Sequence, residues 1–136
     1  MTGTVILRHI LLSDPAVSAL VSSDKIIVDD AFPQGFVLPG ILIGSVSTEL
    51  NKVVKRGSRR HHFEHVSTEI HCSDSPTRRD IKHALMKAGD QKFPTRDGLE
   101  NIVVEFIKHV ADGISQTTNV RMAESYFRVS WSEPVT

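Results

Sequence analysis

The stretch HFEHVSTEIHC, residues 62–72, alternates more clearly between apolar and polar side chains than any other part of the chain. One phase holds the small and apolar residues Val66, Thr68, Ile70 and Cys72. The other phase holds the polar residues Ser67, Glu69 and His71. A period of two is typical of a strand with one buried face. We therefore predict a half-buried strand here, in which Cys72 is a buried small residue and not a reactive thiol.

Helical patterns lie on both sides of this strand. Near the start, apolar residues four apart predict a helix over Val5–Leu12 with Thr4 as its cap, and Pro15 suits the first position of a second helical turn over Pro15–Val21. After the strand, Ser75 as N-cap, Pro76 and apolar residues at helical spacing predict an amphipathic helix that Gly89 ends.

The remaining apolar runs are rich in β-branched residues or alternate, which favours strands. They cover the ranges Lys25–Val28, Ile41–Leu50, Asn101–Val110 and Val120–Ser132, with an irregular excursion over Asp29–Pro39. Within Ile41–Leu50 the pattern does not decide which face is buried. Two hairpins, 41–72 and 101–132, then flank one helix. The sequence predicts an α+β fold, an antiparallel sheet of about four strands with helices packed on one face.

The bulk composition is that of one packed domain. The chain has 136 residues, of which 40% are hydrophobic and 24% charged, so we expect a single domain over residues 1–136. No apolar run approaches the ~20 residues that cross a bilayer, and the start lacks the features of an export signal. One cysteine excludes an intramolecular disulfide. We expect synthesis in the cytoplasm and no membrane partner.

Sixteen basic and sixteen acidic residues balance, but the positive charge is concentrated in the middle of the chain, where residues 51–100 hold eleven basic and seven acidic side chains. Five cations crowd a predicted exposed hairpin loop over residues 51–60, namely Lys52, Lys55, Arg56, Arg59 and Arg60. Two interpretations stand. Such a run is normally a solvated hairpin tip. Alternatively it contacts DNA phosphates without reading sequence, since no aromatic residue lies within the loop to stack on bases.

The histidines do not suggest a metal site. On a strand, His61, His65 and His71 project from one face together with Glu69, but His61 and His65 are about 13 Å apart along it, too far to share one ion. No nucleophile elbow and no phosphate-binding glycine loop is present. We therefore predict no catalytic, cofactor-binding or metal-binding residue and no cofactor.

The order of motifs resembles the tail-completion proteins of long-tailed bacteriophages, also called tail terminators or head–tail joining proteins. The similar segments are ILLSDPAVSALVSSDKIIVDDAFPQGFVLPGILIGSVS (10–47), HVSTEIHCSDSPTRRDIKHALMKA (65–88) and YFRVSWS (126–132). They share a leucine-rich helix ending in Asp-Pro, a pair of prolines six residues apart at Pro33 and Pro39, and a closing strand with aromatic residues.

This resemblance implies a structural virion protein that forms a ring, a homohexamer, at the neck of the virion. The ring would cap the tail tube and join it to the head-side connector or stopper protein. The cations of 52–60 would then line the DNA channel or contact a neighbouring subunit, for which the acidic Asp24, Asp29 and Asp30 are candidate partners. The alternatives are another neck protein, such as a head–tail stopper or adaptor, and a small nucleic-acid-binding domain.

Overall fold

A computed structural model describes residues 2–28, 31–46, 52–56, 59–96, 98–115 and 118–134 of the chain. The elements follow in the order α1 (Thr2–Ser13), α2 (Pro15–Leu20), the 3₁₀ helix η1 (Ser23–Lys25), β1 (Ile26–Val28), β2 (Gly40–Ser45), β3 (Lys52–Arg56), β4 (Arg59–Cys72), α3 (Ser75–Ala88), β5 (Glu100–Ile114) and β6 (Arg121–Pro134).

The strands form one mixed sheet, so the α+β class is confirmed and the predicted sheet of about four antiparallel strands is wrong in two respects. Five strands run in the order β1-β2-β4-β6-β5, and β3 pairs with β4 beside this path. β1 is parallel to β2, because the excursion after β1 carries the chain back to the end of the sheet where β1 started. Every other pairing is antiparallel.

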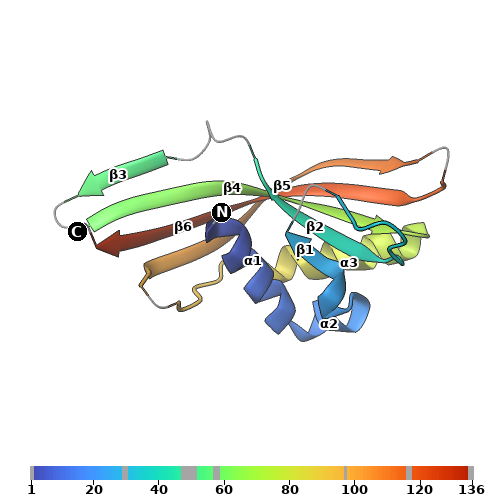
Figure 1. Cartoon of the computed structure of the whole chain (residues 1–136), viewed down its shortest axis with the longest axis horizontal. Helices are drawn as coiled ribbons and strands as arrows, with labels where there is room; N and C mark the ends of the chain where they lie inside the picture. Colours follow the sequence, from blue (N-terminus) through green and yellow to red (C-terminus); the bar gives the residue numbers. More distant parts are fainter. Residues whose placement is uncertain are drawn as a thin grey trace.

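The three α-helices cover one face of the sheet (Figure 1). The helices bury the apolar phase of β4: Val66, Ile70 and Cys72 are fully buried against the helical layer, as their alternation predicted. In β2 the same layer buries Ile41 and Ile43, which settles the face that the sequence left open. The first helix contributes Ile6, Leu7 and Leu11 to this core.

The start of α2 at Pro15 is confirmed, whereas α1 and α3 begin three residues and one residue before the predicted positions. Thr4 is buried inside α1 and does not cap it, because the helix already begins at Thr2. Asp14 caps α2 by accepting hydrogen bonds from the amides of Ala16 and Val17. Asp74, one residue before the predicted Ser75, caps α3 by accepting from the amide of Thr77. Carboxylates fill both caps because they satisfy amides that no carbonyl in the helix reaches.

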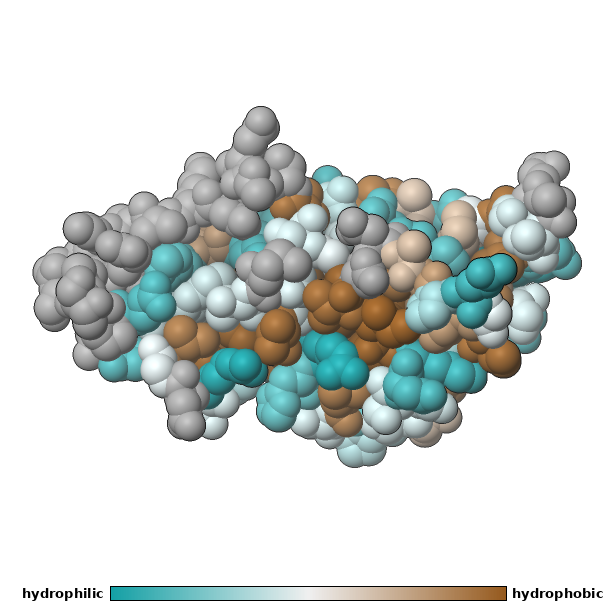
Figure 2. Space-filling view, viewed as in Figure 1, coloured by the Kyte–Doolittle hydropathy of each residue, from teal (hydrophilic) through white to brown (hydrophobic). Residues whose placement is uncertain are grey.

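The sheet is longer than the helical layer that supports it (Figure 1). At one end β3 and the start of β4 extend away from the helices, and at the other end the hairpin of β5 and β6 does so. Figure 2 shows apolar residues gathered near the centre of the molecule in this view, around β1 and its neighbours, with hydrophilic residues around them. No helix among the described residues is long and apolar enough to span a membrane.

Candidate assembly surfaces

The five predicted cations lie on a β-hairpin and not in a loop. β3 pairs with the start of β4 from Lys52 opposite Phe63 to Arg56 opposite Arg59. The predicted loop was wrong because its valines, Val53 and Val54, favour extended backbone. We call residues 52–60 the basic hairpin. Residues 57 and 58 lie outside the described residues, as do the side chains of 52–60.

Pairing within the basic hairpin places like charges opposite each other. Lys55 lies directly opposite Arg60, and Arg56 directly opposite Arg59. Directly opposed like charges destabilise a strand pair. The hairpin therefore concentrates positive charge at one end of the sheet, and its five cations remain candidates for contacts to DNA or to another subunit.

Three of the four histidines of β4 have separate side-chain partners, and the buried Nδ1 of the fourth, His65, has none among the described residues. His61 Nδ1 shares a hydrogen bond of 2.6 Å with Ser132 Oγ, whereas His71 Nε2 lies 2.6 Å from Glu69 Oε1. His62 faces the helical side, where its ring stacks on Trp131 and its Nε2 lies 2.7 Å from Glu133. In the described part of the chain, no group of three or more His, Cys, Asp and Glu side chains is arranged to hold a metal ion.

Cys72 is fully buried, as its phase in β4 predicted. Its Sγ donates to the carbonyls of Asp74 and Arg121. Burial raises the pKa of the thiol above its ordinary value, against the opposing effect of the hydrogen bond to Asp74. A thiol held protonated is a poor nucleophile, so Cys72 has a packing role.

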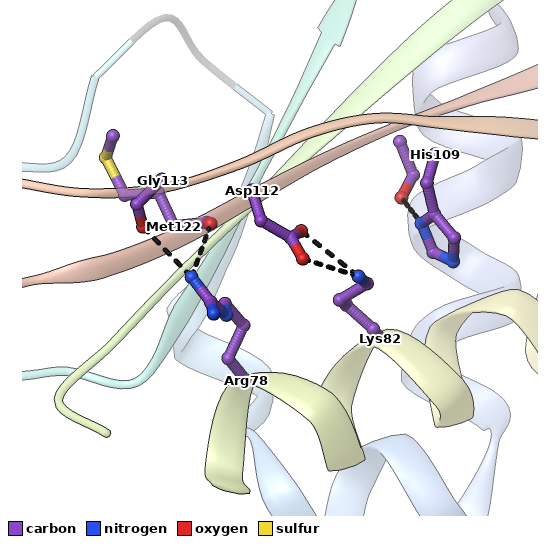
Figure 3. Close-up of polar contacts among 7 residues, drawn as sticks. Arg78, Lys82, His109, Asp112, Gly113 and Met122 are labelled. Atoms are coloured by element: carbon purple, nitrogen blue, oxygen red, sulfur yellow. Dashed lines mark hydrogen bonds and ion pairs between the residues drawn. The ribbon is translucent and has the colours of Figure 1, made fainter. Parts of the chain in front are cut away.

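At the other end of the sheet, α3 supports the hairpin of β5 and β6 (Figure 3). We call the described residues 107–115 and 118–126 the hairpin arm. Arg78 Nη1 donates to the carbonyls of Gly113 at 3.0 Å and Met122 at 3.4 Å, one on each strand of the arm. Four residues further along α3, Lys82 Nζ lies 2.9 Å from Asp112 Oδ2. These contacts hold the arm in one orientation relative to the helix.

A third polar contact, within the arm itself, involves His109, whose Nδ1 shares a 2.7 Å hydrogen bond with Ser125 Oγ on the opposite strand (Figure 3). Partial burial lowers the pKa of His109 below its ordinary value, and the nearby Lys82 ammonium lowers it further, while Asp112 acts in the opposite direction. A neutral His109 therefore fits this position best.

The outer edge of β5 is covered only along its first half. Lys92 forms a two-way backbone bridge with Val104, and Asp90 Oδ1 accepts from the amide of Phe106. Beyond Phe106 the strand has two irregularities in its pairing with β6, next to Ile107 and Val110. Bulges and short covering segments are the means by which edge strands avoid unwanted pairing.

Past the cover, β5 exposes β-branched apolar side chains. Ile107 and Val110 are each 40% exposed, and Ile114 is 50% exposed. The sequence predicted a strand here from its β-branched residues but ended it at Val110, because the polar and small residues that follow mask its continuation to Ile114. Segment 90–92 determines which part of the β5 edge is covered. The local period of apolar residues does not predict this contact, because it joins residues far apart in the chain.

The chain shares its architecture with a solved virion structure. It matches a chain of the "virion of native gene transfer agent (GTA) particle" with a TM-score of 0.67 and 13% sequence identity, over 93% of this chain and 91% of that chain. The two chains have the same fold. No protein-family model and no curated protein sequence matches this chain.

Proposed function

We propose that this protein is a structural component of a phage-like virion, and specifically a tail terminator that assembles into a ring, without enzymatic activity. The observation that carries this proposal is the match to a chain of a gene transfer agent virion along nearly the full length of both chains. The resemblance of the motifs at 10–47, 65–88 and 126–132 to tail-completion proteins agrees with it.

The shape of the subunit suits ring assembly. A closed ring with rotational symmetry joins each subunit to the next through two different surfaces. The sheet has two different ends beyond its helical layer, the basic hairpin at one and the hairpin arm at the other (Figure 1). The arm is supported by α3 through Arg78 and Lys82, so it is ordered before any partner arrives.

In this proposal the ring, a hexamer, sits at the neck of the virion. One rim binds the tail-tube protein and the other binds the head-side connector or stopper. The basic hairpin contacts either the next subunit or, without sequence preference, the DNA that passes through the channel.

Electron microscopy with the tail-tube protein encoded in the same genome tests the proposal. Purified chain added to polymerising tubes should form rings at tube ends and shorten the tubes, whereas an unrelated neck component should leave tube length unchanged. A chain that never associates with tube ends rules out the terminator role. Rings that bind only a head connector instead favour the alternative of a stopper or adaptor.

The basic hairpin supports a second candidate, a small nucleic-acid-binding domain, because strand pairing brings five cations to one end of the sheet. This candidate requires the isolated chain to bind duplex DNA with a strong salt dependence, and replacement of Arg56, Arg59 and Arg60 by Ala to reduce the affinity and the salt slope together. Absence of binding at low salt eliminates it.

A further inference from the structure

The sheet carries a second pair of directly opposed like charges, of sign opposite to the basic hairpin. In the pairing of β4 with β6, Glu69 lies directly opposite Glu124 on the face away from the helices. Both side chains are partly exposed. Glu69 contacts His71, and among the described residues Glu124 has no ion-pair partner. We call Glu69 and Glu124 the acidic pair.

The acidic pair borders a shallow hollow of about 190 Å³. Its lining includes Ala111 and Gly113 of β5 and Met122 of β6, besides the two glutamates. Small residues at two of these positions leave the carboxylates accessible from the open side of the sheet. The hollow is therefore a surface that a cationic side chain can enter.

One exposed apolar residue of β5, Val110, directly precedes Ala111 of this hollow in the chain. Glu124 is opposite Ala111 in the register, and Val110 lies beside that position on the uncovered edge, whereas Ile114 is opposite Arg121 in the phase of β6 that faces the helices. Val110 is 40% exposed and Ile114 is 50% exposed. Charge and apolar surface together are the usual composition of a contact between proteins, in which the apolar part contributes affinity and the charges set orientation.

The basic hairpin and the acidic pair cannot neutralise each other within one subunit. Both lie on β4, where Arg59 and Glu69 are ten residues apart, about 33 Å along an extended strand. This separation exceeds the screening length of roughly 8 Å at physiological salt. Their nearest opposite charges within the subunit are Glu133 opposite Arg60 and His71 beside Glu69, so both clusters stay open to a charged partner from another copy.

We propose that the basic hairpin of one copy docks on the acidic pair and the adjoining edge of β5 of the next copy. The inference rests on the proposed ring, of which it specifies the contact. It replaces the acidic partners suggested by sequence, of which Asp24 lies in η1 beside the helical layer and Asp29 and Asp30 lie outside the described residues. The contact is heterologous, because two different surfaces meet, and repeated head to tail it generates a ring when the rotation between copies closes.

Charge reversal tests the contact by sedimentation or native mass measurement of the purified chain. One variant reverses the acidic pair, Glu69→Lys with Glu124→Lys. The other reverses the opposed pair at the tip, Arg56→Glu with Arg59→Glu. Each variant alone should associate at least about tenfold more weakly than the unmodified chain, because like charges then meet at every contact.

An equimolar mixture of the two variants provides the decisive measurement. Copies that alternate present complementary charges at both contacts, so association should return in the mixture. The matched control is Asp24→Lys with Asp80→Lys, which changes the net charge by the same amount at exposed sites and should leave association unchanged. Thermal unfolding of each variant verifies that it is folded, and Glu69→Gln with Glu124→Gln replaces a reversal variant that is not, with a smaller loss expected.

The contact is overturned if the reversed variants associate like the unmodified chain, if the mixture stays dissociated, or if the unmodified chain is monomeric at high concentration. It is also overturned if the Asp24 and Asp80 control dissociates. Failure of the tail proposal gives a different result: charge-dependent rings form, but they do not bind tube ends. Binding to tube ends that ignores charge reversal supports the tail role and removes this contact.

Discussion

Gly89 ends α3 for a reason of packing at the residue scale. Its φ of −100° is accessible to any residue, so the position does not need glycine for its backbone. A Cβ there would instead overlap the ring of Phe127, which is fully buried in the core. The sequence predicted the helix end at Gly89 correctly, on the grounds that glycine commonly ends helices. The structure gives a different reason for glycine at this position, which is the close approach of the Phe127 ring.

We expect Gly89→Ala to lower the free energy of unfolding by about 1–3 kcal/mol, because the buried Phe127 ring must move. Denaturant unfolding followed by circular dichroism measures this change. Gly113→Ala is the control, because its Cβ meets no atom within 4 Å. Equal stability of the two variants would contradict the proposed overlap with Phe127.

His109 should make the stability of the fold depend on pH. Its pKa is lowered in the folded state, so the unfolded chain binds more protons as the pH falls below the ordinary histidine pKa of about 6.5. This contribution to stability is complete above that pH and is lost between the unfolded and the folded pKa. Unfolding midpoints at pH 7.5 and about 5.5 should therefore differ less in His109→Asn than in the unmodified chain. An unchanged difference would assign the pH dependence to other groups.

At the scale of elements, α3 and the hairpin arm form a unit through one arginine. Arg78 binds a carbonyl on each strand of the arm, and hydrogen bonds from a charged donor are stronger than neutral ones. The neighbouring ion pair of Lys82 with Asp112 is more exposed and contributes less, since surface pairs are worth about 0–1 kcal/mol.

Arg78→Ala should loosen the arm while the centre of the sheet stays intact. The expected result is faster amide hydrogen exchange in residues 107–126, corresponding to a local loss of about 1.5–3 kcal/mol, with little change in β2 and the middle of β4. Arg79→Ala is the matched control, because that side chain is 79% exposed on the same helix. Uniform acceleration across the sheet would show that Arg78 stabilises the whole fold and not the arm.

At the scale of the whole molecule, zero formal net charge conceals two opposed clusters at different places on one sheet. In the proposed assembly such a subunit would associate through local charges, without a net field that attracts other molecules. The proposed head-to-tail contact would neutralise both clusters at once, and a closed ring would leave no unpaired end.

Self-association should accordingly weaken with salt. We expect ring dissociation to increase as NaCl rises from about 0.05 M to about 0.5 M, since screening shortens the range of the charged contact to a few Å. Mass measurement across this series tests the effect, and the unfolding midpoint, measured in parallel, should change little. Salt-independent association would mean that apolar contacts at β5 dominate the interface.

The sequence by itself determined the α+β class, the buried phase of β4 with Cys72, and the position of α3, because each depends on the local period of apolar residues. It also located the cations of the basic hairpin, but not their strand conformation. Only the tertiary structure decided the parallel pairing of β1 with β2, the cover that ends at Phe106, the contacts of Arg78 and the opposition of Glu69 to Glu124. The physical reason is that periodicity records which face of a segment is buried, whereas strand order and register depend on contacts between residues far apart in the chain.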